Sequence, residues 1–556
     1  MQLLDYIVII VFSLGILAAG LSFSGSGKNM KSFFAAGGAV PYWISGLSLF
    51  MSFFSAGTFV VWGSIAYTHG WVSVTIQWTM AIAGFIIGFV LAPKWHGTRA
   101  LTAAEYITQR LGLKVQKLYS YLFLAISLFT TGGFLYPVAK IVEVSTGFSL
   151  QWCIIGLGLV IILYTTVGGL WAVIVTDVLQ FIILTAGVVV VVPLAFKEVD
   201  GVAGFVQNAP DDFFQLLNGE YTLGFIIAFA LYNLFFISGN WAYVQRYTSV
   251  PSKKDAKRVG YIFGSLYLIS PVVWMLPPMI YKVLNPELSG FGDEGAYLMM
   301  CKEVLPVGML GLMLGAMIFA TSSSVNTTLN IAAGVFTNDL YKNVRPNSSI
   351  KHLMTVARGA TIVFGILTIL VALLVPMMGG IVEVVLSVGA ITGGALYLPP
   401  LWSLFSKRQT GRSILVATIF SLIINLFFKF ASPALLDLKL TRGQEMILGV
   451  IAPLLILVIY EIKYSLVKRT NPYYENYIRI KSAMKEKELD EVDVETDSGA
   501  QNYHGRKVIS LGVLGTGMLI TAIGTFAENG TLLVIGTGIG VVLVALFIRP
   551  KKNKES

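Results

Sequence analysis

The sequence predicts an all-α protein that crosses a membrane many times, with about fifteen transmembrane helices. Of its 556 residues, 56% are hydrophobic and only 12% are charged, and the mean hydropathy is +0.76. Soluble domains carry about 25% charged residues, so a soluble core could not bury this much apolar surface. Basic residues between the apolar runs produce the net charge of +10. That charge therefore indicates membrane topology and gives no reason to expect a nucleic-acid partner.

The apolar runs predict the helices in order along the chain. The first run, 4–22, has no basic region before it and no clear cleavage site, so we expect a retained helix and not a signal peptide. Each later run is long enough to span a bilayer. The expected spans are 4–22, 41–68, 73–93, 117–146, 149–167, 171–196, 222–246, 258–284, 305–338, 354–377, 380–406, 411–431, 443–463, 507–526 and 530–548.

The charges of the connecting loops predict the orientation. The basic loops are KNMKS, KWHGTR with QRLGLK, RYTSVPSKKDAKR, YKNVRP and SKRQTGR, and the tail RPKKNKES is basic as well. All of them fall on one side of the membrane if the N-terminus faces outward. The opposite loops are rich in acids, as in NPELSGFGDEGA. The positive-inside rule then places the N-terminus outside and the C-terminus in the cytoplasm. We expect a multi-pass protein of the cell membrane, and specifically of a bacterial inner membrane.

Two of the expected spans contain polar or glycine interruptions. One lies at Ser55-Ala56-Gly57 and the other at Ser238-Gly239-Asn240, five helices apart. Broken helices at matching places in two repeats are typical of transporter binding sites, although serine and glycine also permit close helix packing. We therefore expect a division into 1–40 (first helix and loop), 41–196 and 197–406 (two inverted repeats), 407–463 (peripheral helices), 464–506 (polar cytoplasmic linker) and 507–556 (two last helices and tail).

A stretch rich in side-chain oxygens, FATSSSVNTTLN, interrupts the apolar span 305–338. Helical spacing places four of its residues on one face: Ala320, Ser323, Ser324 and Thr327. Asn326 and Asn330 form an adjoining stripe. Hydroxyl and carbonyl oxygens without a carboxylate suit a monovalent hard cation. Alternatively, these hydroxyls bond back to carbonyls of their own helix or join neighbouring helices.

Charged residues inside apolar spans indicate further polar contacts. Asp177 lies in the span 171–196, where we expect it to face protein or water beside a cationic partner. Alternatively it is an acid at a helix start, where the helix dipole favours negative charge. Lys140 and Glu143, three residues apart, are expected to form a local pair.

No catalytic or cofactor motif is found in a suitable context. Cys153 and Cys301 are isolated, the four histidines are scattered, and HExxH, CxxC, Walker and GxSxG patterns are missing where they would function. We expect no enzyme activity, no cofactor and no metal ion other than the monovalent cation. The segment 464–506 is expected to be a solvated linker, or alternatively an element that binds a partner the sequence does not identify.

Several motifs together resemble the sodium/solute symporter family. They are ILYTTVGGLWAVIVTDVLQ, TAAEYITQRLG, GNWAYVQRYTSV, and SSSVNTTLN followed by VFTNDLY, and the resemblance covers residues 1–463. It implies the inverted five-helix repeat fold of the bacterial leucine transporter, with extra N- and C-terminal helices. It also implies a sodium site made by the carbonyls of Met51, Phe54 and Ala320 and the hydroxyls of Ser323 and Ser324.

The resemblance implies further residues for a second ion and for the solute. A possible second sodium site comprises Asp177, Ser323, Asn326 and Thr327, although Asn326 replaces a serine of the two-sodium pattern. Positions matching the substrate pocket are Ser55, Thr58, Gln77 and Asn240, with Trp78, Phe236, Trp241 and Tyr243 as stacking or gating groups. The arginine that binds the carboxylate in sialic acid carriers has no match in SLFTTGGFLYP.

The resemblance thus predicts a sodium-coupled symporter that imports a small polar solute by alternating access. A sugar or related neutral molecule is favoured over sialic acid, another carboxylate or an amino acid. The expected partners are the solute, sodium ions and the lipid bilayer, and no protein partner is identified. Alternatives are a proton-coupled or uncoupled carrier of the same fold and a membrane sensor of solutes.

Overall fold

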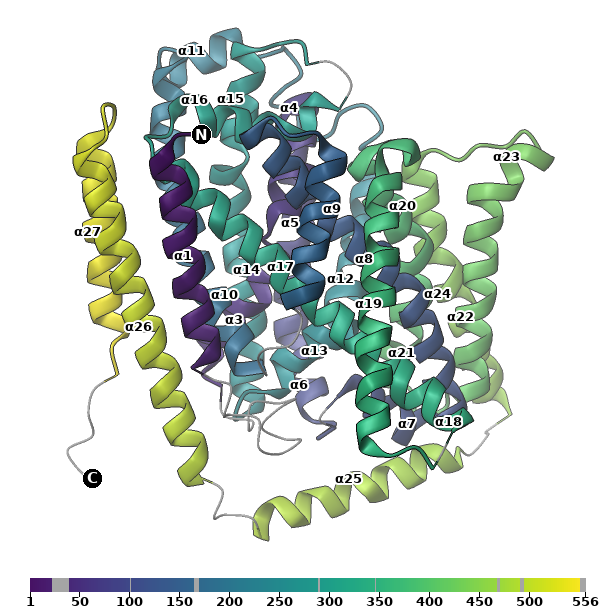
Figure 1. Cartoon of the computed structure of the whole chain (residues 1–556). Coiled ribbons are helices and arrows are strands. Elements are labelled where there is room, and N and C mark those ends of the chain that lie inside the picture. Colours follow the sequence, from purple (N-terminus) through teal and green to yellow (C-terminus); the bar gives the residue numbers. More distant parts are fainter. Residues whose placement is uncertain are drawn as a thin grey trace.

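The computed structural model describes residues 1–22, 40–100, 102–164, 170–288, 291–345, 347–467, 471–490 and 495–550. Within these residues the secondary structure is helical apart from an isolated bridge between Asn218 and Tyr221. Most helices run alongside one another between two ends of the molecule, and the N-terminus lies at one of these ends (Figure 1). The all-α prediction is confirmed.

The long helices follow the apolar runs of the sequence. In the described part of the chain, 11 helices are long and apolar enough to cross a membrane, or up to 12 if the bent pair α12–α13 is one span. Three other expected spans hold only shorter apolar helices within the described residues: Tyr42–Met51, Leu150–Ile162 and Met309–Ser322. The expected count of about fifteen therefore remains a prediction.

The main helices are α1 (Leu3–Leu21), α5 (Val72–Ile86), α8 (Leu113–Thr146), α9 (Leu150–Tyr164), α10 (Leu170–Lys197), α14 (Lys253–Trp274), α15 (Leu276–Leu284), α17 (Met309–Val335), α19 (Ile350–Leu374), α20 (Gly380–Thr392), α22 (Gly411–Leu426), α24 (Arg442–Leu466), α26 (Glu495–Thr525) and α27 (Thr531–Ile548).

Both expected helix interruptions are present. Helix α3 (Tyr42–Met51) stops at Met51, and the span continues as the π-helix η2 (Thr58–Trp62) and as α4 (Gly63–His69). Helix α12 (Leu223–Gly239) meets α13 (Trp241–Thr248) at an angle of 64°. Asn240 between them has an extended backbone, and its side chain accepts a hydrogen bond from the N–H of Ala242 at 3.0 Å. This side-chain cap starts α13 where the backbone of α12 ends.

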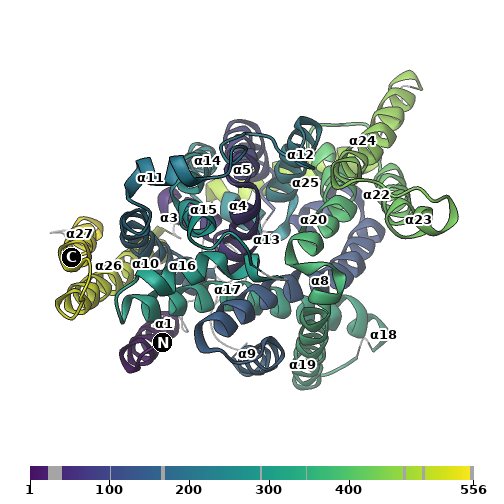
Figure 2. The same cartoon turned by 90° about the horizontal axis from the view of Figure 1, so that it is seen from above.

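The helices around the interruptions form the middle of the bundle. Helix α3 packs against α10 and α14, and α17 packs against α1, α8, α10 and α19. Viewed from above, α26 and α27 form one edge of the molecule and α22 to α24 form another (Figure 2). The interrupted helices are thereby surrounded by protein, which is where irregular backbone can be tolerated in a membrane protein.

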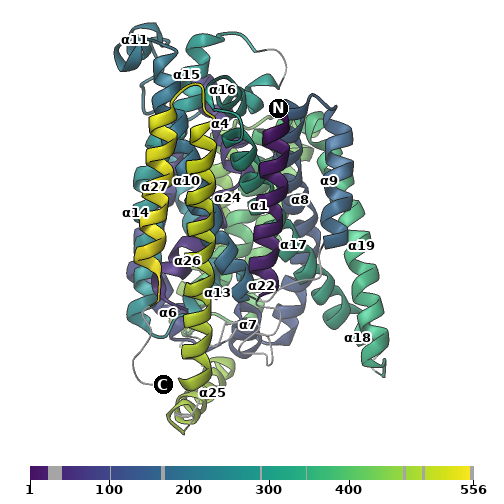
Figure 3. The ribbon, with the colours of Figure 1, turned by 60° about the vertical axis from the view of Figure 1, so that its left-hand side comes forward.

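The two ends of the bundle carry different connections. Helices α11 (Gly201–Asn208) and α16 (Ala296–Val304) lie at the end that holds the N-terminus (Figures 1 and 3). Helices α6 (Ala92–His96), α7 (Ala103–Leu111) and α18 (Lys342–Val344) lie at the opposite end, together with α25 (Pro472–Asp490). The predicted linker 464–506 is thus largely helical in its described part, and α25 runs across the ends of the bundle helices.

Candidate functional site

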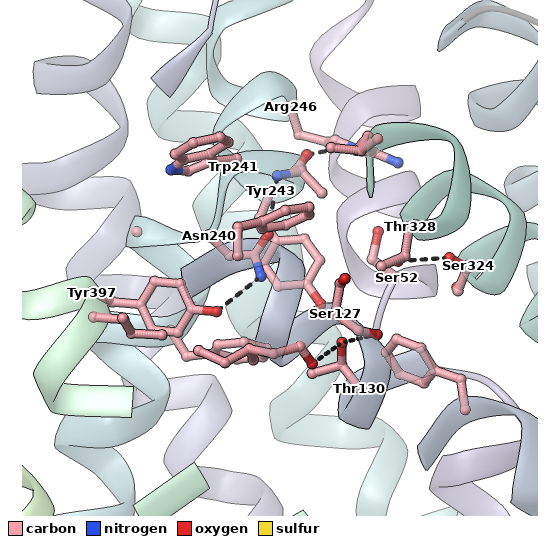
Figure 4. A pocket seen from close by; sticks show the side chains of 18 of the residues that line it. Ser52, Ser127, Thr130, Asn240, Trp241, Tyr243, Arg246, Ser324, Thr328 and Tyr397 are labelled. Carbon is pink, nitrogen blue, oxygen red and sulfur yellow. Dashed lines mark hydrogen bonds between the residues drawn. The ribbon is translucent and has the colours of Figure 1, made fainter. Parts of the chain in front are cut away.

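Two cavities meet beside the interruption between α12 and α13. One of them, which we call the upper cavity, has a volume of about 160 Å³ and is bordered by Ser55, Thr58 and Asn233. The lower cavity has a volume of about 120 Å³ and is bordered by Asp177, Arg246 and Ser324 (Figure 4). Residues lining both are Ser52, Ile126, Thr130, Phe134, Phe236, Tyr243 and Tyr397.

The upper cavity is lined by neutral side chains. None of its described lining residues is charged. Its polar groups come from the first interruption and from several helices, among them α8, α12 and α14. The hydroxyl of Thr58 donates to the carbonyl of Phe53 at 2.7 Å, and the amide of Asn233 donates to the hydroxyl of Thr79 at 2.8 Å. The Asn233 carbonyl oxygen remains as a possible acceptor. Hydroxyl, amide and aromatic groups of this kind can bind an uncharged polar molecule.

Aromatic rings lie between the two cavities. Tyr243 packs against Phe53 with a ring-centroid distance of 4.4 Å and against Phe236 at 5.5 Å. Phe236 in turn contacts Tyr397 edge-on at 5.2 Å. Asn240 reaches the Tyr397 hydroxyl with its amide nitrogen at 3.5 Å (Figure 4). Because Phe236, Tyr243 and Tyr397 line both cavities, a solute that passed between them would have to displace these rings.

The residues expected at the main sodium site lie where α17 faces the first interruption. Met51, Phe54 and Ala320 are buried. Among the described backbone hydrogen bonds outside regular helices, none is accepted by the carbonyl oxygen of Met51 or of Phe54. The N–H of Ala56 donates to the hydroxyl of Thr321 at 3.0 Å, which joins the interruption directly to α17. The side chain of Ser323 lies outside the described part of the chain.

Several hydroxyls of α17 bond within their own helix. Thr321, Ser322, Ser324 and Thr328 each donate to the carbonyl four residues earlier, at distances of 3.0, 2.7, 3.4 and 3.0 Å. This is the alternative that the sequence left open. The Ser324 bond to Ala320 is long, and Ser324 also borders the lower cavity. The side chains of Asn326, Thr327 and Asn330 lie outside the described residues.

Asp177 has the cationic partner that its position predicted. Its carboxylate accepts a hydrogen bond from the Ser48 hydroxyl at 2.6 Å and lies 3.9 Å from the Arg246 guanidinium. Only 6% of Asp177 is exposed, and it lies about two turns after the start of α10, so the alternative of a structural acid near the helix start stays open. These contacts join α10, α3 and α13 at one point. The expected local pair of Lys140 and Glu143 is also confirmed, at 2.9 Å.

Two expected binding residues point elsewhere. Gln77 is buried on α5, where its amide donates to the carbonyl of Ser73 at 3.3 Å, and it lines neither cavity. Trp78 donates from its indole nitrogen to the carbonyl of Leu268 at 3.0 Å and also lines neither cavity. Trp241, by contrast, borders the lower cavity and stacks on Phe123 at 5.6 Å.

Other cavity residues were missed by the sequence reasoning. They include Ser52, Thr130, Asn233, Tyr267, Thr392 and Tyr397. Asn233 could have been found, because it is a lone amide in the apolar stretch FALYNLFFI and polar side chains in such stretches are costly unless they have a role. Thr130 gave a weaker signal within SLFTTGG, since a threonine in a membrane helix is usually explained by packing.

Known proteins match most of the chain. The profile of the sodium:solute symporter family matches residues 33–421. A sodium/glucose cotransporter of Vibrio parahaemolyticus is 28% identical over 77% of this chain and 86% of its own length. A sodium/sialic acid symporter of Proteus mirabilis is 27% identical over 77% of this chain and 90% of its own length.

Solved structures resemble the fold. The structure of a Na⁺-coupled sialic acid symporter in a substrate-bound, outward-open state has a TM-score of 0.70 at 24% identity, and it covers 83% of this chain and 98% of its own. The nucleobase-cation-symport-1 transporter Mhp1 has a TM-score of 0.50 at 15% identity, over 79% of this chain and 96% of its own. These relatives are transporters and not enzymes. Because the family profile covers most of the chain, this protein belongs to the sodium:solute symporter family.

Proposed function

We propose that this protein is a sodium-coupled symporter that imports a neutral polar solute, such as a sugar or a related molecule, by alternating access. The observation that supports this substrate class is the upper cavity, whose described lining has hydroxyl, amide and aromatic groups but no charge. A bound carboxylate would need a cation to offset its desolvation. The guanidinium of Arg246 borders only the lower cavity, where it faces Asp177.

The proposed coupling ion lies between the first interruption and α17. Its ligands would be the carbonyls of Met51, Phe54 and Ala320 with the hydroxyls of Ser323 and Ser324. The Ala56 to Thr321 hydrogen bond brings these two elements together. Sodium bound there would hold α3 and α17 in one arrangement, and one charge moving through 100 mV contributes about 2.3 kcal/mol to uptake. Coupling requires that sodium bind the two access states with different affinity.

A second ion near Asp177 remains part of the proposal, with Ser323, Asn326 and Thr327 as further ligands. Asp177 already has Arg246 and Ser48 as partners. A sodium ion at this carboxylate would therefore compete with a tethered guanidinium, which argues for weaker binding than at the first site.

A second candidate substrate is sialic acid or another carboxylate. The sialic acid symporter of Proteus mirabilis covers as much of this chain as the glucose cotransporter does. Ser55 and Thr58, which the resemblance placed at the substrate pocket, both border the upper cavity. Against this candidate, the residues of α8 that border the cavity, including Thr130, carry no positive charge.

The proposal is tested with the purified full chain in liposomes. Uptake of labelled glucose, galactose, myo-inositol and sialic acid is measured with an inward sodium gradient and with potassium in place of sodium. We expect one neutral solute to accumulate only with sodium. Ser324→Ala should reduce that uptake by raising the sodium concentration needed for half-maximal transport.

A matched control is Ser322→Ala, because Ser322 also donates within α17 but lines neither cavity. This variant should transport like the parent. Uptake that is equal in potassium would overturn sodium coupling in favour of a proton-coupled or uncoupled carrier. Accumulation of sialic acid alone would overturn the neutral substrate class and leave sodium coupling standing.

A further inference from the structure

Three lysines from three separate elements lie together at the end of the bundle that carries α25. Lys94 belongs to α6, Lys253 is the first residue of α14, and Lys481 belongs to α25. The Lys253 stem lies on the C-terminus of α6, because a β-carbon placed on Gly97 would come within 3.1 Å of the Lys253 Cε atom. Elements that are distant in sequence therefore present their amines to one region, which we call the lysine cluster.

A row of buried aromatic rings holds α25 beside α6. Tyr477 of α25 contacts Tyr106 of α7 edge-on at 5.6 Å, and Tyr106 contacts Trp95 of α6 at 5.2 Å. All three rings are less than one-tenth exposed. Lys481 follows Tyr477 by one helical turn, and its amine lies 6.0 Å from the Tyr477 ring centre. Lys481 is thus positioned by packing and does not extend freely into solvent.

The positive charge of the cluster is not balanced by the described protein groups. None of the described salt bridges includes Lys94, Lys253 or Lys481. Burial and then the neighbouring cations Lys253, Arg99 and Lys94 lower the pKa of Lys481 below its usual value. The nearby acid Asp255 is engaged within α14, by Ser252 at 2.6 Å and Arg258 at 3.3 Å.

An exposed apolar face adjoins the lysine cluster on the same helices. Helices α5 and α14, with the π-helix η3 (Ile87–Leu91) between α5 and α6, pack closely where Gly88 meets Gly260. Phe89 of η3 is 68% exposed and Tyr261 of α14 is 37% exposed. The Lys257 amine lies 5.9 Å from the centre of the Phe89 ring. Lys257 lies one turn of α14 beyond Lys253, so an exposed apolar ring meets an amine next to the lysine cluster, as acyl chains meet headgroups in a bilayer.

We propose that the lysine cluster binds the phosphate of an anionic phospholipid, whose acyl chains lie against Phe89 and Tyr261. Three amines that have no acidic partner among the described residues suit a phosphate. The apolar face beside Lys257 suits acyl chains, which a soluble anion lacks. Because Lys481 belongs to the segment between α24 and α26, the bound lipid fastens α25 to the ends of α6 and α14. This interaction does not depend on the identity of the transported solute or on its coupling ion.

The test measures lipid binding to the delipidated full chain in detergent. Phosphatidylglycerol and phosphatidylcholine with identical acyl chains are titrated separately, and bound copies are counted by native mass spectrometry. We expect preferential binding of phosphatidylglycerol. The variant Lys253→Gln/Lys481→Gln should weaken this preference by about fivefold for each lysine removed.

The matched control is Lys342→Gln/Arg345→Gln, which removes two exposed cations at the same end of the molecule, at α18 and away from α25 (Figure 2). The control should bind both lipids like the parent. If the cluster variant and the control lost their preference for phosphatidylglycerol to the same extent, the proposal would be overturned, because the attraction of anionic lipid would then be unspecific. Displacement of phosphatidylglycerol by soluble glycerol phosphate would also overturn it, in favour of a site for soluble anions. Unchanged thermal unfolding of both variants verifies that they are folded.

Discussion

At the scale of single residues, Asp5 is the clearest case of a charge that positions the candidate ion site. It is 2% exposed, and its carboxylate accepts hydrogen bonds from the N–H groups of Gly308 at 2.7 Å, Gly311 at 3.1 Å and Gln2 at 2.9 Å. The two glycines begin α17, whose first N–H groups have no partner within the helix and carry partial positive charge. Asp5 of α1 therefore fixes the start of the helix that carries Ala320 and Ser324.

Replacing this carboxylate should destabilise the protein. Asp5→Ala leaves two buried N–H groups of α17 without an acceptor, so we expect the free energy of unfolding to fall by roughly 2–3 kcal/mol. The measurement is thermal unfolding in detergent with an intrinsic fluorescence readout. Asp200→Asn is the control, because Asp200 is exposed and its positive φ of 58° is tolerated by asparagine. A variant Asp5→Ala as stable as this control would contradict the role of Asp5.

At the scale of elements, the close crossing of α5 and α14 depends on residues without side chains. A β-carbon on Gly260 would lie 2.5 Å from the backbone of Gly88, and one on Gly84 would lie 2.8 Å from Gly264. Small residues at such contacts allow two membrane helices to approach closely and gain dispersion energy. The crossing also joins two helices that border the upper cavity, α5 through Met80 and α14 through Tyr267.

A methyl group at this crossing should force the helices apart. We expect Gly260→Ala to lower the free energy of unfolding by about 1–3 kcal/mol, because the overlap is with backbone that cannot move aside locally. Gly536→Ala in α27 is the matched control, since nothing lies within 4 Å of its added carbon. The control should be neutral or slightly stabilising. Thermal unfolding of both variants, side by side, decides between packing and a general effect of replacing helical glycine.

The end of α4 should respond to pH through His69. Burial lowers the pKa of His69, with Glu220 acting to raise it and Arg442 to lower it, and its ring lies edge-on to Tyr221 at 5.2 Å. The folded protein therefore binds the proton less well than the unfolded chain, whose histidine pKa is about 6.5. The contribution of neutral His69 to the free energy of unfolding is therefore fully present above about pH 6.5, and it is lost as the pH falls below that value.

We thus expect His69→Gln to make the unfolding temperature less sensitive to acid between about pH 7 and pH 5. The measurement compares the unfolding midpoints of parent and variant across this range. His504→Gln, in the N-terminal part of α26, is a control for histidine replacement as such. If the parent and His69→Gln lose stability in parallel on acidification, His69 is not the responsible group.

At the scale of the whole molecule, the charges of the loops separate the two ends of the bundle. Lys94, Lys253 and Lys342 lie at the end that carries α25, whereas the acid-rich segments around α11 and between α15 and α16 lie at the other end (Figures 1 and 3). Basic residues are retained on the cytoplasmic side during insertion. The arrangement therefore agrees with an N-terminus outside and a C-terminus in the cytoplasm.

Cysteine labelling in intact cells tests this orientation. Val202 in α11 is 62% exposed and Lys342 in α18 is exposed, while the native cysteines Cys153 and Cys301 are buried and give little background. We expect an impermeant maleimide to label Val202→Cys in intact cells and Lys342→Cys only after the membrane is opened. The reverse pattern would invert the topology without affecting the fold.

The sequence determined by itself those features that depend on one segment at a time. The positions of the membrane helices follow from the length of apolar runs, because a bilayer requires about 20 such residues. The interruptions at Ser55-Ala56-Gly57 and Ser238-Gly239-Asn240, and the need of Asp177 for a partner, follow from local chemistry in an apolar surrounding. The family motifs supplied Ser55 and Thr58, both of which border the upper cavity.

Only the tertiary structure decided which faces of different helices meet. The partner of Asp177 is Arg246, and Lys94 meets Lys253 and Lys481, although no periodicity relates these positions. Gln77 and Trp78 turn away from the cavities while Asn233 of α12 borders one. The physical reason is that helical spacing defines the faces of one helix, whereas the rotation of each helix about its axis is set by packing against its neighbours.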